Sequence, residues 1–359
     1  MKGYRAPTWL FGAGALGGNL QTIWPALVGK RFHGPAPRFE RTRINTPDGD
    51  FIDFDWLEQT KPRADAPLLV LFHGLEGSSG SHYAQAFAHW ARQHGWGFVV
   101  PHFRGCSGEL NLAPRAYHSG DFEEIGWMLA QCRARHASID DAAHDAARNT
   151  TNSATRTALM LAVGVSLGGN ALLRWAQEAG DTAAQTVSAV AAVSSPIDLT
   201  AGGHAIGRGF NRQVYTRMFL RSMVPKALRK LEQHPGLFNR KRLQAAQNLY
   251  DFDNVFTAPL HGFKDTDDYW KRGSAQPHLA QIRIPTLVLN ARNDPFVPGA
   301  SLPQASEVGP HVTLWQPLHG GHVGFPSGKF PGHVMGLPER VMGWMTAATQ
   351  TTTSTHAHG

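Results

Sequence analysis

The chain has 359 residues, of which 42% are hydrophobic and only 17% are charged. This balance excludes a disordered chain and is typical of a globular protein with a well-buried core. The 34 basic and 27 acidic side chains give a formal net charge of +7. No nucleic-acid-binding module accompanies this charge, so we expect no nucleic-acid partner and at most weak peripheral contact with acidic lipid surfaces.

The N-terminal segment begins with Lys2 and Arg5 but is not followed by the apolar run of a signal peptide. No stretch of about 18 apolar residues occurs, so we expect no transmembrane segment. Cys106 and Cys132 are too few for a disulfide framework. These features together predict a cytoplasmic protein.

Residues 12–17 match the dinucleotide pattern G-x-G-x-x-G, but no strand-helix-strand unit surrounds them. We therefore predict no dinucleotide site and no cofactor. The pair His319 and His322 has no second ligand cluster nearby with tetrahedral spacing, so we predict no metal site either.

The apolar and alternating runs predict eight strands and four long helices. The strands are expected at 39–44, 51–56, 68–72, 97–101, 158–163, 188–194, 285–290 and 312–315, and the helices at 82–94, 121–135, 167–179 and 334–346. The first two strands flank a turn and form a hairpin, whereas the others alternate with helices. Such alternation predicts an α/β fold with a mainly parallel sheet and helices on both faces.

Three further segments interrupt or extend this pattern. Residues 137–157 are polar and are interpreted as a surface excursion, and residues 347–359 as a disordered tail. Residues 199–275 are predicted to be a helical cap inserted into a core formed by 1–198 and 276–346. Apolar residues of the cap are candidates for an acyl-binding pocket: Phe210, Tyr215, Met218, Phe219, Leu220 and Met223.

A G-x-S-x-G pattern at 164–168 places Ser166 between two glycines. Because a strand precedes the pattern and a helix follows it, we expect a nucleophile elbow. The strained turn lifts the serine hydroxyl above the sheet at a helix N-terminus, where unpaired amides favour developing negative charge. Ser166 is the predicted nucleophile; Cys106 and Ser107 lack this strand-to-helix setting.

A nucleophilic serine needs a base and an acid that orients the base. Asp294 follows the strand predicted at 285–290, and His322 lies beyond the last predicted strand. The chain order Ser, Asp, His is the order expected after such an elbow. Asp198 remains a rival for the acid and His319 a rival for the base.

Backbone amides must also stabilise the oxyanion of the tetrahedral intermediate. The loop His73-Gly74-Leu75-Glu76-Gly77 follows the strand at 68–72. In folds with a nucleophile elbow, this loop supplies one backbone N–H donor of the oxyanion hole. The other donor is the amide after the nucleophile. The predicted oxyanion hole therefore consists of the N–H groups of Leu75 and Leu167, and an ordinary glycine-rich turn is the alternative for the first loop.

The chain resembles the bacterial YheT-like family of α/β-hydrolases. The matching stretches are 18–22 (GNLQT), 46–51 (TPDGDF), 72–78 (FHGLEGS), 102–109 (HFRGCSGE), 117–120 (YHSG), 165–170 (VSLGGN) and 320–325 (GGHVGF). The chain departs from the family at 18–20, which lack the expected proline and histidine, in the expanded segment 137–157, and in the polar tail. None of these departures involves the proposed triad.

The resemblance implies a serine hydrolase that cleaves carboxylic esters through an acyl-enzyme, acting on a small-molecule or lipid ester. It does not identify the physiological substrate. Two alternatives use the same triad, an acyltransferase and a lipid-directed (phospho)lipase. A third is a ligand-binding protein that has kept the fold without the chemistry. Neither acyl-chain length nor oligomeric state follows from the sequence.

Overall fold

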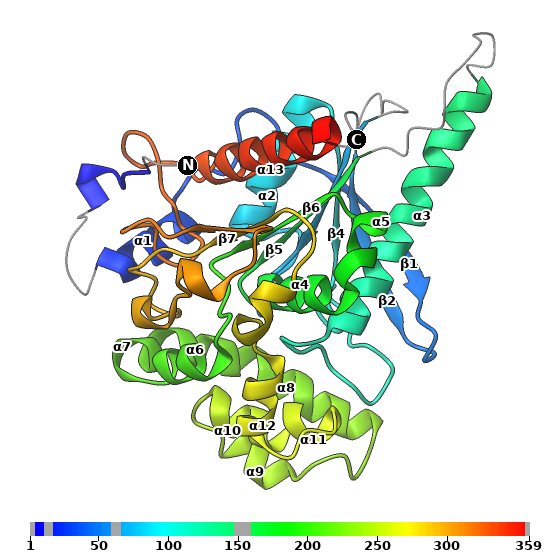
Figure 1. The fold of residues 1–359 in the computed structure, drawn as a ribbon. Helices are drawn as coiled ribbons and strands as arrows, with labels where there is room; N and C mark the ends of the chain where they lie inside the picture. Colours follow the sequence, from blue (N-terminus) through cyan, green and yellow to red (C-terminus); the bar gives the residue numbers. More distant parts are fainter. Residues whose placement is uncertain (1–3, 11–16, 59–65, 147–158, 356–359) are drawn as a thin grey trace.

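A computed structural model describes residues 4–10, 17–58, 66–146 and 159–355. An eight-stranded sheet crosses the molecule in the order β1-β2-β4-β3-β5-β6-β7-β8 (Figure 1). The strands are β1 (Phe39–Asn45), β2 (Phe51–Leu57), β3 (Leu68–Phe72), β4 (Gly97–Pro101), β5 (Met160–Val165), β6 (Ala189–Val193), β7 (Thr286–Leu289) and β8 (Val312–Trp315). The predicted α/β architecture is therefore confirmed.

Strand direction places the loops that follow β3 and β5 to β8 at one edge of the sheet. Only β2 runs antiparallel to its neighbours, β1 and β4, and all other pairs are parallel. Phe72 pairs with Gly164, and Val193 pairs with Leu289. Because parallel strands end together here, their following loops meet.

Helices cover both faces of the sheet. Helices α3 (Phe122–Ala146) and α4 (Leu167–Ala179) pack on one face, where Ile125 and Leu172 are completely buried. Helices α2 (His82–His94) and α13 (Gly336–Thr355) cover the other face through residues such as Phe87 and Met342 (Figure 1). Strand side chains are buried on both faces, which explains the continuous apolar runs in the sequence.

Two helices extend further than the sequence analysis predicted. Helix α3 continues to Ala146, so the first part of the predicted surface excursion is helical, while 147–158 lie outside the described residues. Helix α13 continues to Thr355, through most of the predicted tail. The hydroxyls of Thr346 and Thr349 donate to the carbonyls of Met342 and Met345, four residues earlier, so these polar residues extend the helix instead of ending it.

One N-terminal helix was missed by the sequence analysis. Helix α1 (Gly17–Leu27) lies beside the loops at the carboxyl edge of the sheet, where Gly18 packs against the carbonyl of Asn293. Its apolar periodicity is interrupted by Gln21, Thr22 and Pro25, which hid the helix. Of the discarded dinucleotide pattern, 12–16 lie outside the described residues.

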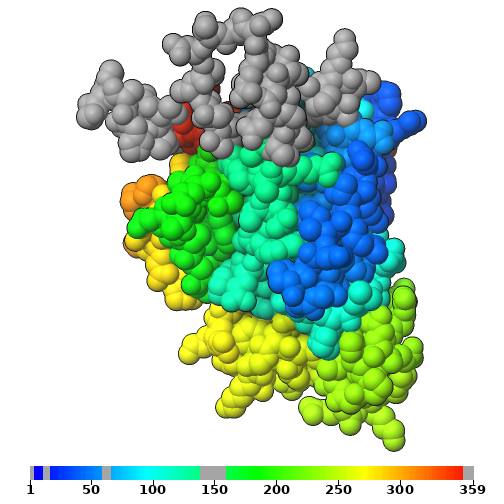
Figure 2. Space-filling model, turned by 90° about the vertical axis from the view of Figure 1, so that its right-hand side faces the viewer, coloured from blue at the N-terminus to red at the C-terminus, as the bar shows by residue number. Residues whose placement is uncertain are grey.

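Between β6 and β7 the chain forms short helices, which we call the helical segment (residues 199–273). Its elements are α6 (Leu199–Ile206), α7 (Gly209–Asn211), the π-helical turn η3 (Arg212–Thr216), α8 (Arg217–Gln233), α9 (Arg240–Gln244), α10 (Leu249–Val255), α11 (Thr257–Leu260) and α12 (Thr266–Gly273). Much of the segment projects as a lobe beyond the sheet, at the bottom of Figures 1 and 2.

Candidate active site

Ser166 sits in a strained turn between β5 and α4. Its φ of 52° lies in the left-handed region, which a residue other than glycine rarely adopts. The flanking glycines are required by space: a Cβ on Gly164 would lie 2.5 Å from the carbonyl oxygen of Gly168, and a Cβ on Gly168 would lie 2.4 Å from that of His73. The Ser166 amide donates to Val193 at 2.8 Å, which fixes the turn to β6.

The three predicted catalytic side chains form one hydrogen-bonded row. Ser166 Oγ lies 3.0 Å from His322 Nε2, and His322 Nδ1 lies 2.9 Å from Asp294 Oδ2. Asp294 and His322 are buried, at 5% and 8% exposure. A carboxylate only accepts hydrogen bonds, so Nδ1 carries the proton and Nε2 of the neutral ring is free to accept from the serine hydroxyl.

Asp294 is held in place by the turn after β7. Its Oδ1 accepts from the amides of Phe296 at 2.8 Å and Val297 at 3.2 Å. The ring of Phe296 also packs 4.2 Å from that of His322, centroid to centroid. Asp294 therefore both closes this turn and contacts His322.

The loop that carries His322 is held by residues whose roles were missed from the sequence. Thr22 Oγ1 accepts from the His322 amide at 2.8 Å, and Gln21 Oε1 accepts from the Gly320 amide at 2.9 Å. The Val323 amide donates to Ser194 Oγ at 3.0 Å. Two adjacent polar residues in the 18–22 stretch, Gln21 and Thr22, were the only local hint of these contacts. Their neighbours in the sequence do not indicate a partner 300 residues away.

The rival residues occupy other positions. Asp198 is the N-cap of α6, and its Oδ1 accepts from the Ala201 amide at 2.9 Å. His322, not His319, lies between Ser166 and Asp294.

The predicted oxyanion loop lies directly against the serine. A Cβ on Gly74 would be 3.1 Å from the Cβ of Ser166, so a larger residue there would press against the serine. Leu75 and Leu167 both line the cavity that Ser166 and His322 line. Within the described part of the chain, the amides of Leu75 and Leu167 have no protein acceptor.

His73 fixes the start of this loop. Its Nδ1 donates to the Gly74 carbonyl at 2.8 Å, and its Nε2 accepts from the Phe103 amide at 3.1 Å. Complete burial lowers the pKa of His73 to about 3, so the ring is neutral. A neutral ring with one donor and one acceptor matches both backbone partners.

A cavity of about 160 Å³ opens from Ser166 between the sheet edge and the helical segment. Of the six predicted pocket residues, Phe219 and Met223 line it, whereas Leu220 does not, and Phe210 and Met218 are 48% and 54% exposed. Tyr215 is buried against Phe296, outside the lining.

Helix α8 turns one face to the cavity, and its lining residues on that face are Phe219, Met223, Lys226, Ala227 and Lys230. Met218 is rotated about 100° from Phe219 and points elsewhere.

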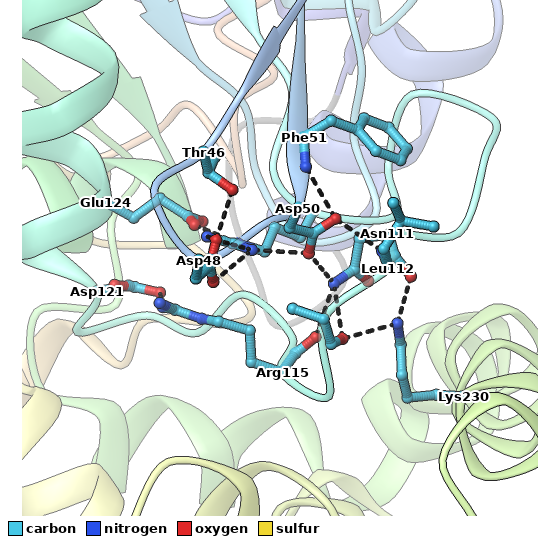
Figure 3. Close-up of polar contacts among 12 residues, drawn as sticks. Thr46, Asp48, Asp50, Phe51, Asn111, Leu112, Arg115, Asp121, Glu124 and Lys230 are labelled. Carbon is cyan, nitrogen blue, oxygen red and sulfur yellow. Dashed lines mark hydrogen bonds and ion pairs between the residues drawn. The ribbon is translucent and has the colours of Figure 1, made fainter.

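Arg104 and Asn111 line this cavity and belong to a polar cluster (Figure 3). Arg104 bridges Glu124 and Asp50, and its contact with Asp50 is 2.7 Å long. Burial alone would raise the pKa of Asp50, but hydrogen bonds from Asn111 and from backbone amides hold that pKa below its ordinary value. The cluster thus fixes the loop 102–121, part of which lines the cavity.

Lys230 of α8 joins the helical segment to the same loop. Its ammonium donates to the carbonyls of Asn111 and Ala113, the latter at 2.9 Å (Figure 3). Burial lowers the pKa of Lys230 to about 8. One turn earlier, Lys226 forms an ion pair of 2.7 Å with Glu76 in the predicted oxyanion loop.

In the described ranges, no group of three or more His, Cys, Asp or Glu side chains could hold a metal ion. Across the same ranges, no helix is both long enough and apolar enough to cross a bilayer.

Comparison with known proteins places this arrangement in a family. The alpha/beta hydrolase fold family model matches residues 67–329. "Putative esterase YheT" of Escherichia coli (strain K12) is 37% identical over 331 residues, which cover 91% of this chain and 90% of that protein. "Phospholipase ABHD3" of Mus musculus is 28% identical over 307 residues, covering 83% and 69%.

Among solved structures, esterase Pf2001 of Pyrococcus furiosus covers 88% of this chain and 91% of its own, with 14% identity and a TM-score of 0.48. The family model and the relative at 37% identity agree with the sheet order and with the resemblance noted from the motifs. The chain belongs to the α/β-hydrolase fold family, in its YheT-like group.

Proposed function

We propose that this protein is a serine hydrolase that cleaves carboxylic esters. The observation that carries the proposal is the row Ser166, His322 and Asp294, joined at 3.0 and 2.9 Å, with two unpaired amides at the same cavity. Relatives named as esterases and phospholipases support hydrolysis as the reaction class.

In the proposed first step, Ser166 Oγ attacks the ester carbonyl while His322 Nε2 takes the hydroxyl proton. Asp294 keeps the other ring proton on Nδ1 and stabilises the imidazolium that forms. The amides of Leu75 and Leu167 donate to the oxyanion of the tetrahedral intermediate. His322 then protonates the departing alkoxide, and the acyl-enzyme remains.

In the second step, water gives a proton to His322 and attacks the acyl carbonyl, which releases the acid and restores Ser166. An acyltransferase would differ only in the acceptor, an alcohol in place of water. We therefore keep acyl transfer as the second candidate, to be separated by adding an acceptor alcohol to the assay and measuring transfer against hydrolysis.

We further propose that residues 199–275, which contain the helical segment, form a cap over the site, inserted between core segments 1–198 and 276–346. Its cavity wall is mostly apolar, contributed by Leu199, Ile206, Phe219, Phe252 and Phe256. Such a wall favours the acyl chain of a small-molecule or lipid ester.

Substitution of the nucleophile tests the proposal. Ser166→Ala should abolish labelling by a fluorophosphonate and lower turnover of p-nitrophenyl esters by about 10⁶-fold, since the attacking atom is gone. Substrates from acetate to palmitate report the acyl length that the cavity accepts. Ser107→Ala is the matched control, because Ser107 lies outside the row. Full labelling of Ser166→Ala would refute the assignment.

A further inference from the structure

Glu76 occupies a turn position that normally takes glycine. The amide of Gly77 donates to the carbonyl of Gly74 at 2.9 Å, which closes a four-residue turn with Leu75 and Glu76 at its centre. Glu76 has a φ of 57°, in the left-handed region. A side chain there is strained, and in such a turn glycine is preferred. The contacts of the Glu76 side chain must offset that strain.

Those contacts come from two different parts of the molecule. From the loop 102–121, Tyr117 Oη accepts from the Glu76 amide at 3.1 Å and donates to its Oε1 at 2.9 Å. From helix α8, Ser222 Oγ donates to Oε2, and Lys226 Nζ pairs with the same oxygen at 2.7 Å. Ser222 and Lys226 are four residues apart, so they present their groups from one face of the helix.

The charge of Glu76 matters because of where it lies. Glu76 and Lys226 line the same cavity as Ser166, and the Glu76 side chain is only 10% exposed. An unpaired carboxylate there would oppose the negative charge that develops on the substrate carbonyl in the proposed reaction. The ammonium of Lys226 neutralises it.

We propose that Glu76 is a positioning residue that fixes the Leu75 amide toward the oxyanion and couples this donor to the docking of helix α8. This inference rests on the proposed function. It follows that the oxyanion hole is complete only when α8 lies against the loop and the charge of Glu76 is neutralised, as Lys226 does here. The side chain of Glu76 itself does not touch the substrate carbonyl in this proposal.

Glu76→Gly separates positioning from a structural role. Glycine suits the backbone at this position, so the melting temperature should stay equal to that of the wild type or rise. The kcat for p-nitrophenyl butyrate should fall by about 10- to 100-fold, less than loss of a complete oxyanion donor. KM should change by less than about threefold, since an interaction specific to the transition state is weakened.

Lys226→Met and the double variant Lys226→Met/Glu76→Gln test the coupling to α8. The single variant leaves an unpaired carboxylate in the cavity, and its kcat should fall by about 10-fold. The double variant removes that charge and should recover most of the lost kcat. The effects of the two substitutions would then not add, as they would for independent sites. Arg229→Met is the matched control, because Arg229 is an exposed basic residue of the same helix.

The outcomes distinguish this inference from the proposed function. An active wild type with unchanged kcat in Glu76→Gly would overturn the positioning role alone. A lower melting temperature of Glu76→Gly, with kcat following the folded fraction, would also overturn it in favour of a structural role. Absence of recovery in the double variant would overturn the coupling to α8. A wild type without esterase activity would overturn the proposed function, and this inference with it.

Discussion

The edge of the sheet and the helical segment build opposite sides of one cavity by different means. At the sheet edge, backbone bonds set positions: the amides of Ser166 and Ser194 donate to Val193 and Leu289 at 2.8 and 2.7 Å. The helical segment instead contacts the core through side chains, both apolar ones such as Tyr215 and polar ones such as Lys230, which donates to backbone carbonyls of the loop 102–121.

The two regions also differ in their apolar clusters. The sheet and its covering helices share two large buried clusters, one on each face. The helical segment has smaller clusters of its own, one of which is centred on Leu243, Phe252 and Phe256. A further cluster joins Ile206 and Tyr215 of the helical segment to core residues such as Phe296. The chemistry therefore depends on the sheet edge, and the shape of the cavity on the attachment of the helical segment.

Asp294→Asn tests the sheet edge and should have the largest effect. The amide can donate to His322 Nδ1, which favours the tautomer with the proton on Nε2, where it cannot accept from Ser166. We expect kcat to fall by about 10⁴-fold with little change in the melting temperature. Ester turnover and thermal unfolding measure the two quantities. If kcat fell less than tenfold, the contact of 2.9 Å with His322 would not be catalytic.

Arg104→Met tests the polar cluster at the boundary between the two regions. The variant leaves the buried carboxylates of Asp50 and Glu124 without their cation, which should destabilise the protein by about 3–5 kcal/mol. Urea denaturation at pH 7 measures the loss. Arg240→Met is the control, because the Arg240 contact with Glu232 is exposed and should contribute less than about 1 kcal/mol. If Arg104→Met lowered the free energy of unfolding no more than Arg240→Met, the cluster would not contribute to stability beyond an exposed ion pair.

Asp253→Asn tests the interior of the helical segment through pH. Burial raises the pKa of Asp253 from 3.8 to about 6, while Thr257 and Trp270 donate hydrogen bonds to it. The native state therefore keeps this proton to higher pH than the unfolded state does. The stability that the proton contributes is complete below about pH 4 and is lost as the pH rises through about 6.

The asparagine variant lacks this proton, so its stability relative to the wild type should improve by about 2–3 kcal/mol between pH 4 and pH 7. Comparison across pH cancels the constant cost of an altered hydrogen bond. Urea denaturation at both pH values measures this relative stability. Asp181→Asn is the control, because the Asp181 side chain is exposed. A relative stability that is the same at both pH values would contradict the raised pKa.

Local sequence patterns were sufficient for the architecture and for the position of each proposed triad residue after its strand. Each predicted strand is present within two residues of its expected ends, because buried parallel strands require continuous apolar runs. Ser166, Asp294 and His322 follow β5, β7 and β8, and a parallel sheet brings those strand ends together. Local patterns failed where polar residues extended α3 and α13 and where they interrupted α1.

Only the tertiary structure decided which distant side chains meet. Thr22 holds the loop of His322, Lys226 reaches Glu76, and Phe219 faces the cavity while Met218 on the same helix faces outward. Periodicity identifies an apolar or basic stripe, but the direction of that stripe depends on how the helix is rotated against the core. That rotation is set by contacts between residues far apart in the chain, which no local pattern records.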